Sequence, residues 1–306
     1  MAKLKLYNTL TSLEKERKEV YKKLKITIIS ILIATIVAMY FFLKIFGLQV
    51  FFMLIIFASS WAIKYIYTKL TQDFIDDYKA KVIKPLVKSV DKNFKYYPNH
   101  HINFDYFNDS NLFPQSPDLY YGDDYIGGVI DGVEIEFCDL DIRTKSKNST
   151  HTIFQGLFLV ADFNKHFKYN TIVISDTAQK LFGDMVGNTL QKNNPNRKKL
   201  IKMDDIEFER RFVVYGDDEI ETKYILSNSM MQRIVKLQKK SGKNILISFR
   251  DTKIFVAIEY NRELFEPSIK RSLLKDRSII GYAQILETMK DIVLDLKLNE
   301  KLWSKE

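Results

Sequence analysis

Cysteine is almost absent from this 306-residue chain, and so are the short motifs that mark common enzyme families. The single thiol, Cys138, excludes an intramolecular disulfide and is typical of a reducing compartment. The sequence has no phosphate-binding P-loop, dinucleotide fingerprint, nucleophilic-serine elbow or zinc-protease motif, and no Cys/His pair has zinc spacing. We therefore expect no metal and no cofactor, and the sequence identifies no catalytic residue.

Charge is missing from two long stretches near the N-terminus. Ile26 to Leu43 and Ile45 to Ile63 are apolar runs of 18 and 19 residues, separated only by Lys44. As helices they would each be roughly 27–29 Å long, which matches the hydrocarbon thickness of a bilayer. The pattern predicts a transmembrane hairpin over 26–63 with a tight turn at 44–49. A buried pair of helices in a soluble protein is the alternative.

Positive charge is concentrated beside these runs. Residues 1–100 hold 17 basic and 7 acidic side chains, whereas residues 101–306 hold 30 and 31. A nearly neutral distal domain argues against nucleic acid as a partner and leaves the lipid bilayer as the predicted one. Because lysines flank both runs on the side away from the turn, we expect an inner-membrane protein with both termini in the cytoplasm.

Four segments follow from these patterns. We expect a cytoplasmic juxtamembrane helix over 1–25, the hairpin over 26–63, a helical stalk over 64–95 and a cytoplasmic domain over 96–300. Thr11 and Glu14 have the spacing of a capping box, which predicts a helix start there, and Pro85 predicts a kink in the stalk. The distal domain mixes strand and helix patterns, so the fold class is α+β.

Local patterns predict individual elements of this domain. Asp131-Gly132 lies between alternating residues and predicts a hairpin with a two-residue type I′ turn. Asp251-Thr252 predicts a second hairpin, and Ser227 or Ser229 a helix start. Further strands are expected over 153–163, 171–175, 206–215 and 221–226, with a helix over 176–190.

The tetrapeptide Tyr-Gly-Asp-Asp occurs twice. Each copy is followed, at nearly equal spacing, by a similar segment, Phe158 to Asn164 in the first case and Phe255 to Asn261 in the second. Either the chain contains an internally duplicated β-rich unit, or these short segments recur by chance. Glycine and aspartate are ordinary turn residues, which predicts that both copies are structural turns. The residues concerned are Tyr121, Gly122, Asp123, Asp124, Tyr215, Gly216, Asp217 and Asp218.

Several phrases in their order resemble the domain-of-unknown-function 3137 family of uncharacterised bacterial membrane proteins. They are Phe107 to Phe113, Tyr121 to Gly127, Ile153 to Phe158 with Asp162 to Asn164, Phe208 to Tyr215, and Lys223 to Leu226. The resemblance covers the paired apolar runs and most of residues 70–295. It implies a two-helix anchor, a cytoplasmic α+β domain and no assigned activity. Members of the family are sometimes encoded near LemA-like membrane proteins, which implies such a protein as a partner.

These observations favour a non-enzymatic binding or scaffold module that is anchored in the membrane. One alternative is a metal-dependent hydrolase that holds a divalent ion with Asp123, Asp124, Asp217 and Asp218. Another is an accessory subunit of a transporter, although the apolar runs carry no interior charge that would mark an ion pathway.

Overall fold

The computed structural model describes residues 2–46, 51–113, 115–147, 149–176, 199–276 and 278–296. They fold into two compact units. Unit 1 comprises residues 1–85 together with 265–279, and unit 2 comprises residues 86–264 together with 280–306. The predicted α+β class is confirmed, since one antiparallel sheet and several helices are present.

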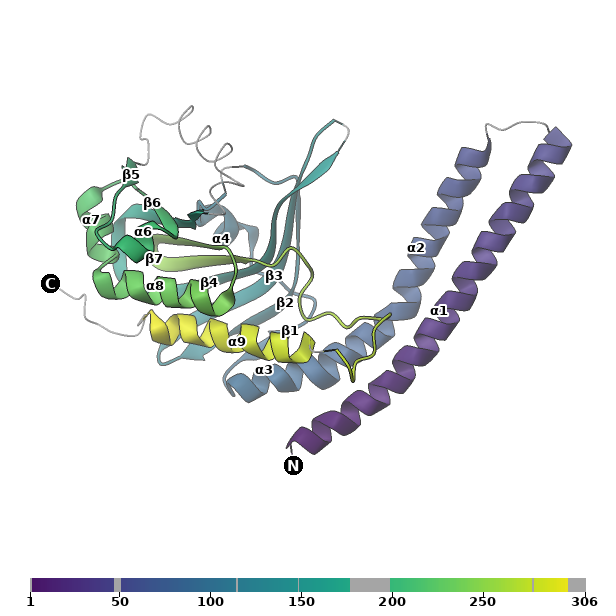
Figure 1. Cartoon of the computed structure of the whole chain (residues 1–306), viewed down its shortest axis with the longest axis horizontal. Helices are drawn as coiled ribbons and strands as arrows, with labels where there is room; N and C mark the ends of the chain where they lie inside the picture. The colour runs from purple at the N-terminus through teal and green to yellow at the C-terminus, as the bar shows by residue number, and fades with distance from the viewer. Residues whose placement is uncertain are drawn as a thin grey trace. The chain divides into compact units, whose positions relative to one another are not determined.

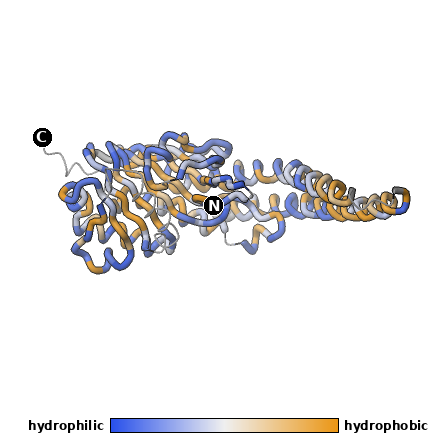
Figure 2. The backbone as a smooth tube through the Cα atoms, turned by 90° about the horizontal axis from the view of Figure 1, so that it is seen from above, coloured by the Kyte–Doolittle hydropathy of each residue, from blue (hydrophilic) through white to orange (hydrophobic). Residues whose placement is uncertain are grey.

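Unit 1 contains two long helices that lie side by side, α1 (Ala2–Phe46) and α2 (Phe51–Tyr78) (Figure 1). Their apolar halves lie next to the connection between them (Figure 2). Thr35 and Ser59 share a hydrogen bond of 2.7 Å across the pair. Within the described residues, one helix qualifies by length and composition to cross a membrane, over Leu6–Ile45, and none of its most apolar stretch is buried.

The boundaries in unit 1 differ from the predicted ones. α1 continues through Lys44 and Ile45 to Phe46, and α2 begins at Phe51, so the helices are not divided at Lys44. Residues 47–49 of the predicted turn lie outside the described residues. The capping box at Thr11 and Glu14 was also wrong. Because α1 begins nine residues earlier, the Thr11 hydroxyl donates to the Tyr7 carbonyl oxygen inside the helix.

The predicted break at Pro85 takes the form of a widened turn. A π-helix, η1 (Lys79–Ile83), follows α2, and the N–H of Lys84 donates to the carbonyl oxygen of Lys79. Proline has no N–H and its ring crowds the preceding turn, which disturbs the regular hydrogen-bond ladder just before it.

Residues 265–279 contact α1 and η1 of the same unit through charged side chains. We call this segment with its partners the latch. Arg17 donates to Glu14 and, at 2.6 Å, to the Ile269 carbonyl oxygen, while Glu14 accepts the Leu273 N–H at 2.9 Å. The buried Lys79 forms a second ion pair, at 2.7 Å, with the partly exposed Glu266. Leu13, Ile269 and Leu273 are buried around these groups.

Unit 2 is built on a seven-stranded antiparallel sheet in the order β1-β2-β3-β4-β6-β5, with β7 on the opposite edge of β4. The strands are β1 (Lys95–Tyr97), β2 (Leu119–Ile130), β3 (Val133–Lys145), β4 (Thr150–Ser175), β5 (Lys199–Ile201), β6 (Phe212–Gly216) and β7 (Ile245–Glu259). The 26-residue β4 pairs with β3 along its first half and with β6 along its second. It therefore joins two smaller sheets into one.

Helices complete unit 2. They are α3 (Lys84–Val90), α4 (Phe104–Asp109), α6 (Ile206–Glu209), α7 (Glu219–Ile225), α8 (Asn228–Ser241) and α9 (Ser278–Asp295). α8 is tied to β4 by a hydrogen bond from Gln238 to Ser175 and to α9 by an ion pair between Lys240 and Asp291. Sixteen buried side chains, among them Phe107, Phe154 and Phe158, form one continuous core cluster.

Some predicted elements are confirmed. β2 and β3 form the expected hairpin, in which Ile130 pairs with Val133 and both Asp131 and Gly132 have positive φ, as a type I′ turn requires. Ser227 caps α8 by accepting the Met230 N–H.

Others are wrong. The two predicted strands at 153–163 and 171–175 are parts of one strand, β4, and the hairpin at Asp251-Thr252 is a single strand, β7, with Asp251 at positive φ. Residues 206–209 and 219–225 are helical because Asp205 and Asp218 cap them. The predicted helix over 176–190 lies almost entirely outside the described residues.

Candidate functional site

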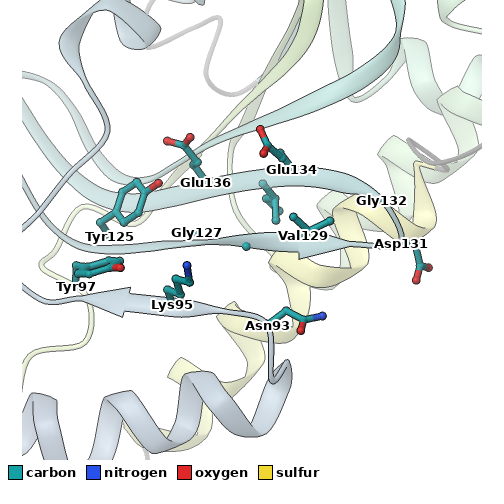
Figure 3. A pocket seen from close by; sticks show the side chains of 12 residues that line it. Asn93, Lys95, Tyr97, Tyr125, Gly127, Val129, Asp131, Gly132, Glu134 and Glu136 are labelled. Carbon is teal, nitrogen blue, oxygen red and sulfur yellow. The ribbon is translucent and has the colours of Figure 1, made fainter.

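The site that the structure offers is an open groove over strands β1, β2 and β3, drawn in Figure 3. Its volume is about 680 Å³, and we call it the β1–β3 groove. The residues at its centre follow from the sheet register, since Lys95 pairs with Gly127 and Gly127 pairs with Glu136. Alternate residues of a strand share one face, so these three form a row across the sheet. The lining consists of Asn93, Lys95, Tyr97, Tyr125, Gly127, Gly128, Val129, Asp131, Gly132, Glu134, Ile135 and Glu136.

Gly127 forms the floor of the groove at the centre of this row. A Cβ at this position would lie 2.8 Å from the Tyr125 hydroxyl oxygen and 3.1 Å from a carbon of its ring. The Tyr125 ring therefore lies over Gly127, which only a residue without a side chain allows. The absence of that side chain lets the Tyr125 ring lie on the floor of the groove, between the strands that carry Lys95 and Glu136.

Tyrosines close one end of the groove. Tyr97 pairs with Tyr125 in the sheet, and their ring centroids lie 6.1 Å apart. Burial raises the pKa of Tyr125, and the Glu136 carboxylate, which accepts its hydroxyl hydrogen, raises it further. Tyr125 is thus a neutral hydrogen-bond donor beside Glu136.

The first Tyr-Gly-Asp-Asp segment lies within β2, where the register shifts between Asp123 and Ile126. Asp124 is buried at positive φ, donates its N–H to the Pro98 carbonyl oxygen and accepts the Tyr96 hydroxyl. It is an irregularity in a strand and not the turn that the sequence predicted. A β-bulge gives the same freedom to aspartate that a tight turn does.

The second copy lies at a different kind of site. Tyr215 and Gly216 end β6, Asp217 accepts the Asn170 N–H, and Asp218 caps α7 by accepting the Glu221 N–H. Strand β3 lies between the first copy and the segment that begins at Phe158. Helices α7 and α8 lie between the second copy and the segment that begins at Phe255. The predicted duplication is therefore wrong, because the repeated sequence segments have different secondary structures around them.

The four aspartates of the hydrolase alternative are not brought together. Asp123 and Asp124 are on β2, whereas Asp217 and Asp218 follow β6, and β3 and β4 lie between these strands in the sheet. The carboxylates of the second pair already accept backbone N–H groups. This arrangement does not form the shared ion site that the alternative requires.

Asp139 is a buried carboxyl that the sequence analysis did not single out. It pairs with Asp123 in the β2–β3 register and accepts the Leu264 N–H at 2.7 Å through Oδ2, while Oδ1 has no hydrogen-bond partner among the described residues. Burial raises the pKa of Asp139 to about 8, and the charges of Asp123, Asp124 and Glu263 add to the rise. The neighbouring Cys138 is fully buried, and its burial raises the pKa of the thiol, so it is a core residue and not a nucleophile.

None of the groove residues was predicted as a site. The available signal was weak: a lysine between aromatic residues on a short strand, and two adjacent glycines just before the Asp131-Gly132 turn. Only the pairing of three strands brings Lys95, Gly127 and Glu136 into one row.

A family model described as a protein of unknown function (DUF3137) matches residues 152–298. Over these residues the chain is similar to the DUF3137 family. The matched segment contains nearly all of β4 and the elements that follow it, from β5 to β7 and from α6 to α9. The resemblance predicted from the sequence also covered the two apolar runs, which lie outside this match. The β1–β3 groove precedes the matched residues, so the similarity to the DUF3137 family says nothing about it.

Other comparisons add little. No curated protein matches the chain. A crystal structure of the mycobacterial trehalose monomycolate transport factor A, TtfA, is similar over 70% of this chain and 96% of that chain, with 9% sequence identity and a TM-score of 0.32. A likeness at this score carries no inference.

Proposed function

We propose that the protein is a non-enzymatic binding module that is anchored in the inner membrane and presents unit 2 to a partner in the cytoplasm. The observation that carries this proposal is the exposure of the apolar residues of α1: Ile33 and Ile36 are 58% and 67% exposed. Apolar surface of this extent on a long helix is unfavourable in water and favourable in lipid.

The second membrane span belongs to the same proposal. Met53, Leu54 and Phe57 of α2 are 78%, 61% and 74% exposed, so α2 also offers an apolar surface beside α1. The hydrogen bond between Thr35 and Ser59 satisfies two hydroxyls within the helix pair, as small polar residues do between helices in lipid. The lysine surplus around the two runs supports cytoplasmic termini.

A binding role for unit 2 is supported by the β1–β3 groove. The groove offers charges, hydroxyls and aromatic rings on a rigid sheet, which is the composition of a recognition surface. The separation of the four aspartates removes the support for a metal-dependent hydrolase. A LemA-like membrane protein, implied by the family resemblance, is the first protein partner to test.

Anchoring is tested with charged substitutions on α1. We expect the double variant Ile33→Glu, Ile36→Glu to leave the membrane fraction, because a charge at the centre of a span costs about 3 kcal/mol. The control is Ile220→Glu with Ile280→Glu, two isoleucines of unit 2 that are 82% and 59% exposed, and it is expected to stay in the membrane after alkaline extraction. Wild-type protein in the soluble fraction would contradict the proposal.

A further inference from the structure

Opposite charges stand on opposite sides of the β1–β3 groove. Lys95 on β1 and Glu136 on β3 flank Gly127, and Glu134 lies next to Glu136 on the same face of β3 (Figure 3). Two inter-strand spacings of about 4.8 Å separate the Cα atoms of Lys95 and Glu136. No ion pair joins them in the part of the chain that the structure describes.

The balance of charge in the groove is negative. Lys95 is its one basic lining residue, against Asp131, Glu134 and Glu136. Within the described residues Lys95 and Glu134 have no hydrogen-bonded partner, so both are available to an occupant. An occupant that complements both signs carries a negative group for Lys95 and a positive group for the carboxylates.

The size of the groove suits a small-molecule ligand or a short peptide end. Its volume of about 680 Å³ exceeds that of a single ion or phosphate and lies within the usual range of small-molecule sites. The rings of Tyr97 and Tyr125 form one wall, and such rings attract cations that lie against their faces.

We propose that the β1–β3 groove binds the chemical group formed by a carboxylate and a cationic side chain, as in arginine or lysine, either free or at the C-terminus of a peptide. The carboxylate lies at Lys95, and the cationic group lies at Glu134 and Glu136 beside the tyrosines. The inference rests on the proposed function, since it names the ligand class of the same groove.

Binding is measured by chemical-shift perturbation on the full chain in nanodiscs. The probes are free L-arginine and an acetylated tripeptide that ends in arginine with a free carboxylate. The control probes are agmatine, which lacks the carboxylate, and N-acetylglutamate, which lacks the cation. Because the charges lie at an open surface, we expect a Kd of roughly 0.1–1 mM for the true ligand.

Three variants test the assigned contacts. Lys95→Met removes the partner of the carboxylate, and the double variant Glu134→Gln, Glu136→Gln removes the partners of the cation. Gly127→Val displaces the Tyr125 ring from the floor, because a Cβ at this position would lie 2.8 Å from the Tyr125 hydroxyl oxygen. Each is expected to weaken binding at least tenfold. Lys202→Met and Glu287→Gln change exposed charges elsewhere in unit 2 and are expected to leave binding unchanged.

The probes distinguish a free amino acid from a peptide C-terminus as the source of the ligand. Binding of the tripeptide alone identifies a peptide C-terminus, binding of arginine identifies a free amino acid, and both support the proposal. Binding of agmatine as tight as that of arginine, or an unchanged affinity in Gly127→Val and Lys95→Met, would overturn it.

The two proposals can fail separately. Recovery of unaltered ligand after incubation is expected for a binding module, whereas turnover of the ligand would contradict the non-enzymatic function and leave the groove assignment intact. Correct anchoring without binding of either probe would contradict the groove assignment alone.

Discussion

Single residues in this protein gain their properties from the register of the sheet. Asp139 has an unremarkable sequence environment, yet its pairing with Asp123 and its burial raise its pKa to about 8, from an ordinary value of 3.8. Gly156 on β4 shows the same dependence, because a Cβ there would lie 2.3 Å from the Ile258 carbonyl oxygen of β7. The close approach of two strands, and not local turn chemistry, requires glycine at this position.

The raised pKa of Asp139 predicts a stability that falls as pH rises. Between about pH 4 and pH 8 the unfolded chain has lost the proton that the folded chain still holds, so each step up in pH favours unfolding. The contribution is full below pH 4 and is lost by pH 8. Its upper limit is roughly 6 kcal/mol, since the pKa rises from 3.8 to about 8 and each pKa unit corresponds to about 1.4 kcal/mol.

The variant Asp139→Asn should remove most of this dependence. Its amide oxygen can still accept the Leu264 N–H, but the side chain no longer ionises. Urea unfolding of unit 2 at pH 5 and pH 8, followed by hydrogen exchange of β3 amides, is the measurement. Asp105→Asn, which changes an exposed carboxylate of α4, serves as the control and should keep the wild-type slope. An identical slope in Asp139→Asn would show that other groups cause it.

Among the elements, the latch gives the helix pair its most specific tertiary contacts. Glu14 and Arg17 are one turn apart on α1 and are 6% and 7% exposed at the side chain. Their bonds to Ile269 and Leu273 join α1 to a segment more than 250 residues away in the sequence. A buried ion pair that is fully hydrogen-bonded fixes one arrangement of the chain, and removal of one partner is costly.

Arg17→Met should therefore release residues 265–279 from α1. The expected loss of local stability is about 3–5 kcal/mol, because Glu14 stays buried without its partner. Faster hydrogen exchange and proteolysis of 265–279 are the measurements. Lys81→Ala breaks the exposed pair with Asp77 and should change little, since pairs at the surface contribute about 0–1 kcal/mol. Equal protection of 265–279 in both variants would contradict the latch.

For the whole molecule, the distribution of lysine predicts the topology. The surplus of 17 basic over 7 acidic residues lies within residues 1–100, whereas the rest of the chain is nearly neutral. Positive residues beside a span stay in the cytoplasm, so unit 2 is expected on the cytoplasmic side and Lys44 on the outer side.

Thiol labelling checks this orientation in a Cys138→Ala background. Lys44→Cys should react with an impermeant maleimide in intact cells. Ile220→Cys, at a position that is 82% exposed, should react only after the membrane is opened. Reaction of Ile220→Cys in intact cells would reverse the predicted topology.

The features that the sequence alone determined depend on neighbours in the chain. The apolar runs at 26–63 predicted long helices, Asp131-Gly132 specified its own turn, and Ser227 specified the start of α8, because each of these choices is made by local backbone and side-chain chemistry. Local patterns failed where tertiary pairing decided. Asp251 has the backbone angles of a turn residue but lies within β7, because β4 pairs with β7 on both sides of it.

Only the tertiary structure decided the candidate site. Lys95, Gly127 and Glu136 are distant in the sequence and become one row when three strands pair in a single register. The same pairing placed the two Tyr-Gly-Asp-Asp segments on strands that are not neighbours, which separated the carboxylates that their sequence appeared to group. A shift of one residue in any of these strands would turn its side chains to the other face, so the groove exists because the register is fixed by the buried side of the sheet.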